Sequence, residues 1–194
     1  MNRYVGGIIV CVLCAGTILK GEMVEYALDV DDYGTLTIDG TEVLHIDSGG
    51  EAWDRTGVLD LTSGWHDVEI VFKNRWGTNV IAFCEMTDTS VVIGLDEMRY
   101  FDDTLGDYAN GLKADYYTLN ADYSTGSYVT TVYGEGPIHH GSTPVSPLYT
   151  MYESVPNTLW AGIYDRWGKF EERLSGQVYV APVPLPGAAL LGFL

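Results

Sequence analysis

Basic residues are scarce in this chain of 194 residues. Lysine and arginine number 10 against 27 aspartates and glutamates, which gives a net charge of −17. A nucleic-acid-binding protein needs a basic face that displaces counterions from phosphate, so the charge balance argues against that class. It argues equally against electrostatic docking on an anionic lipid surface.

Cysteine is scarce as well, at 3 residues, and two of them, Cys11 and Cys14, lie close to the N-terminus. If that segment is cleaved, only Cys84 remains and no disulfide can form within the chain. Cys84 lies in an apolar run, which predicts a buried and unreactive thiol.

The common catalytic motifs are absent. The sequence contains no phosphate-binding loop, no Gly-x-Gly-x-x-Gly and no Gly-x-Ser-x-Gly nucleophile elbow. The adjacent His139 and His140 have no evident third metal ligand beside them. Neighbours on a strand diverge, so Glu171 and Glu172 are expected to lie on a solvated face and not to act as an acid/base pair. We therefore do not expect an enzyme.

The residues that are abundant favour β structure. Hydrophobic residues make up 46% of the chain, with 14 tyrosines and 23 glycines. Tyrosine, threonine and valine are typical of strands, and glycine is typical of turns. No segment has the pattern of an amphipathic helix longer than about three turns. The composition predicts an all-β fold: a single antiparallel β-sandwich or jelly-roll-like domain over residues 21–182.

Local patterns predict where the strands lie. Asp39-Gly40 is a hairpin signal between strands at 35–38 and 41–46. Trp65–Lys73 alternates apolar and polar residues, as a half-buried strand does. Further strands are expected at 24–30, 57–61, 79–86, 111–120, 158–163 and 176–180. Loops or connectors are expected at 47–54, 96–110 and 134–147, and a turn at 31–34.

The N-terminus has the pattern of a secretory signal peptide. Met1-Asn2-Arg3 is followed by an apolar run over 4–19 and by small residues at 15–17. That run is shorter than the roughly 20 residues of a membrane span. We expect residues 1–20 to be a signal that directs export to the extracellular space or the cell surface. The alternative is a buried first strand.

The C-terminal residues 183–194 combine alternating prolines with a short apolar stretch. Val183-Pro184-Leu185-Pro186 resembles the start of a PEP-CTERM sorting tail, in which a transmembrane helix and an arginine cluster follow. Here only about eight apolar residues follow Pro186, so the tail is truncated or the resemblance is accidental. The alternative is an apolar end that packs back on the domain. A membrane would thus be involved only through terminal sorting segments.

The central region resembles the lectin-like module found in anthrax protective antigen, bacterial glycosidases and yeast flocculins. The Asp-Asp turn, the strand ending in Asp39-Gly40 and the Asn-x-Trp-Gly loop at 74–77 make residues 21–95 similar to its later half. Gly-Leu-x-x-x-Tyr-Tyr at 111–117 makes residues 111–182 similar to its opening half. The halves are in swapped order, which implies a circular permutation or two incomplete modules.

The resemblance implies a calcium site. In the sugar-binding members, an Asp-Asp pair and an asparagine bind Ca²⁺, which also holds two sugar hydroxyls; here these are Asp31, Asp32 and Asn74. Arg75 and Trp76 are the implied ligand-binding residues. Ca²⁺ takes six to eight oxygen ligands, so adjacent carboxylates must be turned toward one ion, as a cis peptide between them would do. The alternative is an ordinary Asp-Asp-x-Gly turn without metal.

Two functions follow from these observations. The first is an exported, Ca²⁺-dependent module that binds a glycan or exopolysaccharide. The alternative is a structural subunit of an extracellular filament, sheath or matrix, whose partners are copies of itself. The second gains from the 14 tyrosines, a residue type favoured at interfaces.

Overall fold

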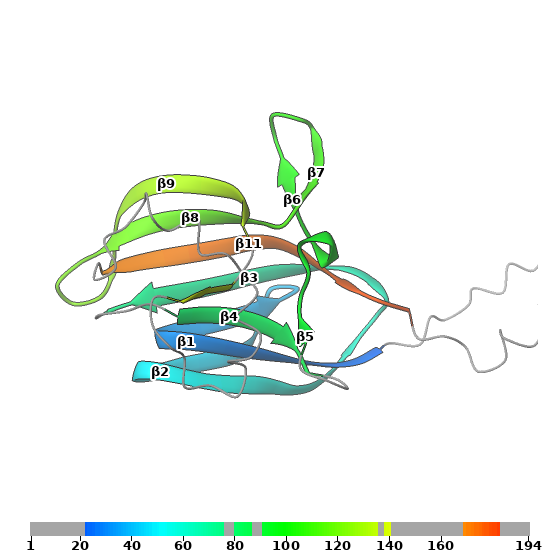
Figure 1. Ribbon diagram of the computed structural model, residues 1–194, viewed down its shortest axis with the longest axis horizontal. Helices are drawn as coiled ribbons and strands as arrows, with labels where there is room; N and C mark the ends of the chain where they lie inside the picture. The colour runs from blue at the N-terminus through cyan, green and yellow to red at the C-terminus, as the bar shows by residue number, and fades with distance from the viewer. Residues whose placement is uncertain (1–21, 76–79, 87–90, 136–137, 141–168, 183–194) are drawn as a thin grey trace, which may run out of the picture.

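A computed structural model describes residues 22–75, 80–86, 91–135, 138–140 and 169–182 (Figure 1). These residues form eleven strands and a 3-10 helix, Leu95–Glu97, and every strand pairing is antiparallel. The strands are β1 (Glu22–Ile38), β2 (Thr41–Leu61), β3 (Gly64–Asn74), β4 (Val80–Glu85), β5 (Val91–Val92), β6 (Met98–Asp102), β7 (Asp107–Asn110), β8 (Leu112–Leu119), β9 (Thr125–Glu135), β10 (Ile138–His140) and β11 (Phe170–Val180). The expected all-β antiparallel fold is confirmed. In these ranges no helix has the length and apolar character needed to cross a bilayer.

The long β1–β2 hairpin forms a corner between two layers. The first half of β1 pairs with β4 over Tyr26–Val30, and the second half pairs with β3 over Tyr33–Ile38. β2 follows β1 along its whole length. The partner of β1 therefore changes at Asp31 and Asp32, and one continuous sheet folds over into layers β9–β8–β11–β3–β1 and β1–β4–β10 (Figure 1).

The corner requires a glycine. A Cβ atom built on Gly34 would lie 2.6 Å from Cγ1 of Val30 and 3.1 Å from Cδ2 of Leu28. After the bend, β1 thus packs against its own first half, and position 34 has no room for a side chain.

One hydrophobic core joins both halves of the described chain. Val24, Tyr26, Leu28, Leu36, Ile70, Phe72, Ile81 and Phe83 belong to the same buried cluster as Met98, Leu112, Tyr116, Phe170, Leu174 and Val178. The segment Gly176–Val180 pairs with β3 and not with β1. Figure 1 shows its end on the same side of the molecule as the start of β1.

Several predicted loops are strands. Residues 47–54 continue β2, with a bulge that places Ser48–Gly50 opposite Asp32. Within the expected connector 96–110, residues 98–110 form the β6–β7 hairpin, which projects from the body in Figure 1, and β9 was not expected at all. No turn reverses the chain at 31–34, because β1 runs through it. The predicted strand 158–163, the signal segment 1–20 and the tail 183–194 lie outside the described residues.

The prediction of a solvated Glu171 and Glu172 is wrong, although their side chains do diverge. β11 is a central strand, paired with β3 on one side and β8 on the other, and both glutamates are 0% exposed. Glu172 accepts a hydrogen bond of 3.0 Å from the hydroxyl of Tyr116. Cys84 is buried as predicted, and burial raises the pKa of its thiol to about 12.

Candidate functional site

The Asp-Asp pair lies at the corner, where backbone geometry turns Asp32 inward. Asp32 has a φ of +88°, while the peptide bond that joins it to Asp31 is trans. A positive φ is uncommon for a residue with a side chain and marks a position that the surroundings must hold. The left-handed backbone conformation of Asp32, and not the predicted cis peptide, thus sets the directions of the two carboxylates.

The corner brings the predicted calcium ligands Asp32 and Asn74 next to each other. The backbone N–H of Arg75 donates to Oδ2 of Asp32 at 2.6 Å, which joins residues 43 apart in sequence. Tyr33 pairs with Lys73, so Asn74 ends β3 directly beside Asp32. Both side chains are 1% exposed. Asp31 is half-buried opposite Glu51 of β2, and Trp76 lies outside the described residues.

The donor types fit calcium, which binds carboxylate and amide oxygens. A carboxylate offers about four lone-pair positions, and the backbone N–H of Arg75 occupies one of those of Asp32. In the described ranges, no group of three or more His, Cys, Asp or Glu side chains could hold a metal ion. The set Asp31, Asp32 and Asn74 contains two such residues and an amide. The burial of Asp32 and Asn74 fits an enclosed ion better than one that a sugar also contacts.

Arg75 connects the corner to the outer surface of the sheet. Its Nη1 lies 2.6 Å from Oδ1 of Asp47, and this hydrogen bond holds the pKa of Asp47 below its usual value. Its guanidinium carbon lies 5.5 Å from the ring centre of Tyr33 and 5.4 Å from that of Tyr123. Arg75 thus makes a cation–π contact with each of two aromatic rings.

Three more cations lie on tyrosine rings on the same outer surface. Lys73 is 5.2 Å from Tyr33, Lys169 is 4.9 Å from Tyr123, and Arg173 is 5.0 Å from Tyr117. We call Tyr33, Lys73, Arg75, Tyr117, Tyr123, Lys169 and Arg173 the cation–tyrosine face. On β3 and β8 the buried residues alternate with these positions, so their side chains point away from the core.

A buried carboxylate lies at the centre of this face. Glu171 pairs with Lys73 on one side and Tyr117 on the other. Its oxygens lie 2.6 Å from Nε of Arg173, 2.6 Å from the Thr125 hydroxyl and 3.4 Å from Nζ of Lys73. Burial alone would raise the pKa of Glu171, but these donors bring it below its usual value.

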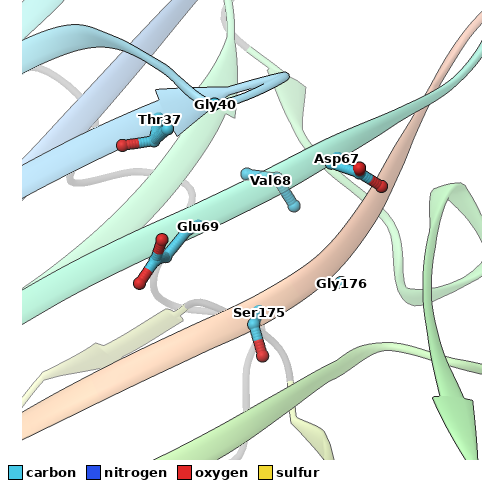
Figure 2. Close-up of a pocket in the computed structure, with 7 residues that line it drawn as sticks. All are labelled: Thr37, Gly40, Asp67, Val68, Glu69, Ser175 and Gly176. Atoms are coloured by element: carbon cyan, nitrogen blue, oxygen red, sulfur yellow. The ribbon is translucent and has the colours of Figure 1, made fainter.

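The other end of the same sheet surface is acidic. A shallow hollow of about 340 Å³ lies there, and Figure 2 shows the row Thr37, Glu69 and Ser175 crossing it on three strands. Asp67 at its rim accepts a 2.8 Å hydrogen bond from the side-chain amide of Gln177. This end offers carboxylates to solvent. A cation also lies beside it: the guanidinium carbon of Arg99 is 4.1 Å from the ring centre of Trp65 and 3.8 Å from that of Tyr108, and its Nε donates to Gln177 at 2.9 Å.

Sequence reasoning named Arg75 but missed the tyrosines and the other cations of the face. The sequence did indicate one of these cations, because the alternation in Trp65–Lys73 places Lys73 on an outer surface of the sheet. Strand register decides which rings it meets, and register between distant strands is not readable from one sequence.

No protein-family model, curated protein or solved structure matches this chain. The resemblance to the lectin-like module therefore remains a prediction that rests on the quoted motifs.

Proposed function

We propose that this chain is an exported, glycan-binding module of the cell surface or extracellular matrix. The observation that carries the proposal is the contact between Asp32 and the backbone of Arg75. It places the Asp-Asp pair beside the Asn74-Arg75 segment, in the order used by the lectin-like module.

The groups around Arg75 suit a sugar. Tyr33 and Tyr123 offer ring faces against which the C–H face of a pyranose stacks. The guanidinium of Arg75 and the carboxylate of Asp47 donate and accept hydrogen bonds, so together they match sugar hydroxyls. In this proposal Asp31, Asp32 and Asn74 hold Ca²⁺ behind the sugar, and the ion stabilises the corner.

A glycan array probed with the full chain, once with calcium and once with a chelator, tests this function. Arg75→Ala is expected to abolish binding. Arg55→Ala is the matched control, because Arg55 also pairs with a carboxylate across β1–β2, Glu25 at 3.4 Å, at a distance from the corner. Binding that survives Arg75→Ala, or an array without any bound glycan, contradicts the proposal.

Thermal unfolding tests the ion separately. A ligand that binds only the folded state raises the melting temperature with the logarithm of its concentration. Asp32→Asn is expected to abolish the calcium-dependent rise and keep the fold, since asparagine tolerates a positive φ and its amide oxygen accepts the Arg75 N–H. A melting temperature that calcium leaves unchanged removes the metal from the proposal.

A structural subunit is the second candidate, and the β6–β7 hairpin favours it. Phe101, Leu105 and Tyr108 on this projecting hairpin are 51%, 70% and 44% exposed. Exposed apolar groups gathered on one element are typical of contact surfaces. Sedimentation of the full chain decides this candidate: assembly that Leu105→Asp abolishes supports it, and a monomer at all concentrations contradicts it.

A further inference from the structure

Most of the described positive charge of this acidic protein gathers on one surface. The described lysines and arginines are Arg55, Lys73, Arg75, Arg99, Lys113, Lys169 and Arg173. Four of these seven belong to the cation–tyrosine face. A fifth, Lys113, pairs with Asp115 on the same outer side of β8, with 2.9 Å between nitrogen and oxygen.

The face joins residues of β1, β3, β8 and β11, and of the segments next to these strands, into one surface. Register places Tyr33 of β1 beside Lys73 of β3, Lys73 beside Glu171 of β11, and Glu171 beside Tyr117 of β8. Tyr117 then contacts Tyr128 of β9 edge to face, at 5.8 Å between ring centres. The row across the outer side of the sheet thus runs from tyrosine through lysine and glutamate to two tyrosines.

The carboxylates that contact these cations leave an excess of positive charge. Arg75 contacts Asp47, while Lys73 and Arg173 share Glu171. These three cations therefore meet two carboxylates. Lys169 is exposed, the side chain of Arg173 is 41% exposed and Tyr128 is 57% exposed, so ligand groups can reach this part of the face.

We propose that the cation–tyrosine face binds an acidic polysaccharide, with its carboxylate or sulfate groups on the arginines and lysines and its sugar rings on the tyrosines. This inference rests on the proposed glycan-binding function and adds the class of glycan. Guanidinium groups bind carboxylate and sulfate through paired N–H donors, and stacked tyrosines give the pyranose rings apolar surfaces.

Nucleic acid is the less suitable polyanion. Its phosphates are closely spaced, at about 1.7 Å per charge along a duplex, and they would meet a chain whose net charge is −17. An acidic glycan carries about one charge per sugar unit, and the pyranose rings between these charges can stack on the tyrosines. At about 0.15 M salt the remaining acidic surface is screened beyond about 8 Å, so the local face dominates binding.

The experiment measures binding of the full chain to polygalacturonate, dextran sulfate and uncharged dextran at physiological ionic strength. We expect at least one acidic polymer to bind about tenfold more tightly than dextran, with affinity that falls as salt rises. Equal binding of dextran, or of other neutral glycans on the array, overturns this inference and leaves the proposed function standing. The absence of binding to any glycan overturns both.

Two charge-matched variants locate the site. Lys169→Gln is expected to weaken binding of the acidic polymer about threefold, as an exposed charge contact does. Arg55→Gln removes the same charge elsewhere and should leave binding unchanged. Lys169 contributes no donor to buried Glu171, so its loss leaves that network in place. Equal effects of the two variants would show that only total charge matters and would overturn the proposal.

Two further outcomes would assign the face to another partner. An oligothymidylate that binds as tightly as the acidic glycan, with the same loss in Lys169→Gln, would make the face a general polyanion surface. Sedimentation that shows salt-sensitive self-association lost in Lys169→Gln would assign the face to the acidic surface of a second copy. Either result overturns the glycan proposal.

Discussion

The two ends of one sheet surface use charge in opposite ways. At the corner end, cations lie on tyrosine rings around Glu171, and their outer parts reach solvent. At the turn end, beside Asp39-Gly40, charged groups are held in hydrogen bonds that close the hairpin. The Asp39 carboxylate accepts from the Asp67 backbone at 2.9 Å and contacts Nδ1 of His66 at 2.7 Å.

In the proposed function, the charged groups at the corner end bind the ligand, while those at the turn end of the same strands stabilise the fold. The hollow in Figure 2 lies toward the turn end and is lined by Asp67 and Glu69. Arg99, stacked on Trp65 and Tyr108, lies beside it, because Gln177 is hydrogen-bonded to both Arg99 and Asp67. A concave shape alone would place a ligand there. The proposed glycan site lies at the other end, where Tyr33 and Tyr123 contact Arg75 beside the Asp32–Asn74 corner.

The largest expected loss of stability comes from replacing the glutamate at the corner end, and a glutamate at the turn end serves as its comparison. Glu171→Ala should lower the free energy of unfolding by about 2–3 kcal/mol, because it leaves Lys73 and Arg173 without a buried partner. Glu69→Ala, at the exposed acidic end, should change it by less than about 0.5 kcal/mol. Urea unfolding measures both, and similar values for the two variants would contradict the distinction.

Two glycines give the next largest effect. Gly34→Ala at the corner should cost about 2 kcal/mol, because the new methyl group would overlap Val30 in a packed core. Gly40→Ala at the turn has open space and a φ of +76°, so only its backbone conformation is strained and the cost should be about 1 kcal/mol. If Gly40→Ala lowers the free energy of unfolding in urea more than Gly34→Ala does, the corner is not as tightly packed as the structure indicates.

The two ends should respond to pH in opposite directions. His66 faces Asp39 and Asp67, and its second nitrogen lies 2.7 Å from the carbonyl of Thr62, so both nitrogens must donate. Burial lowers the pKa of His66, but the hydrogen bonds to Asp39 and Thr62, together with the charges of Asp39 and Asp67, outweigh it and raise the pKa above 6.5. The stability that His66 contributes is therefore complete below pH 6.5 and lost as pH rises through its folded pKa.

At the corner end the pKa of Glu171 lies below 4.5, so its contribution is complete above pH 4.5 and lost as pH falls through the folded pKa. Unfolding measured from acid to mild alkali tests both signs. His66→Gln should lower the free energy of unfolding only at pH values below the folded pKa of His66. The loss should be about 0.5–1 kcal/mol, a small value because Asp39 is half-exposed. A His66→Gln curve parallel to that of the unchanged chain would contradict the assignment.

Local patterns predicted the parts of the fold that local chemistry decides. Asp39 and Gly40 have φ values of +48° and +76°, which is the two-residue hairpin turn that Asp-Gly predicts. The alternation from Trp65 to Lys73 gave β3 correctly. Residues 47–54 were predicted as a loop because Ser48, Gly49 and Gly50 look like one; pairing with β1 accommodates them as a bulge.

Features that depend on distant strands were not predictable. Glu171 and Glu172 look like a solvated pair until β3 and β8 cover both sides of their strand. The nearness of Asp32 and Asn74 was expected from the motif resemblance, while the left-handed Asp32 was not. The rings of Tyr117 and Tyr123 meet Arg173 and Arg75 only through register, which no local pattern encodes.

Hydrogen exchange with and without a saturating acidic glycan tests whether the ligand binds at the corner end. We expect slower exchange in peptides that cover residues 31–35, 71–75 and 115–125, with no change in those that cover residues 37–42 and 64–69. Protection confined to the turn-end peptides, under conditions where the glycan is bound, would contradict binding at the corner end.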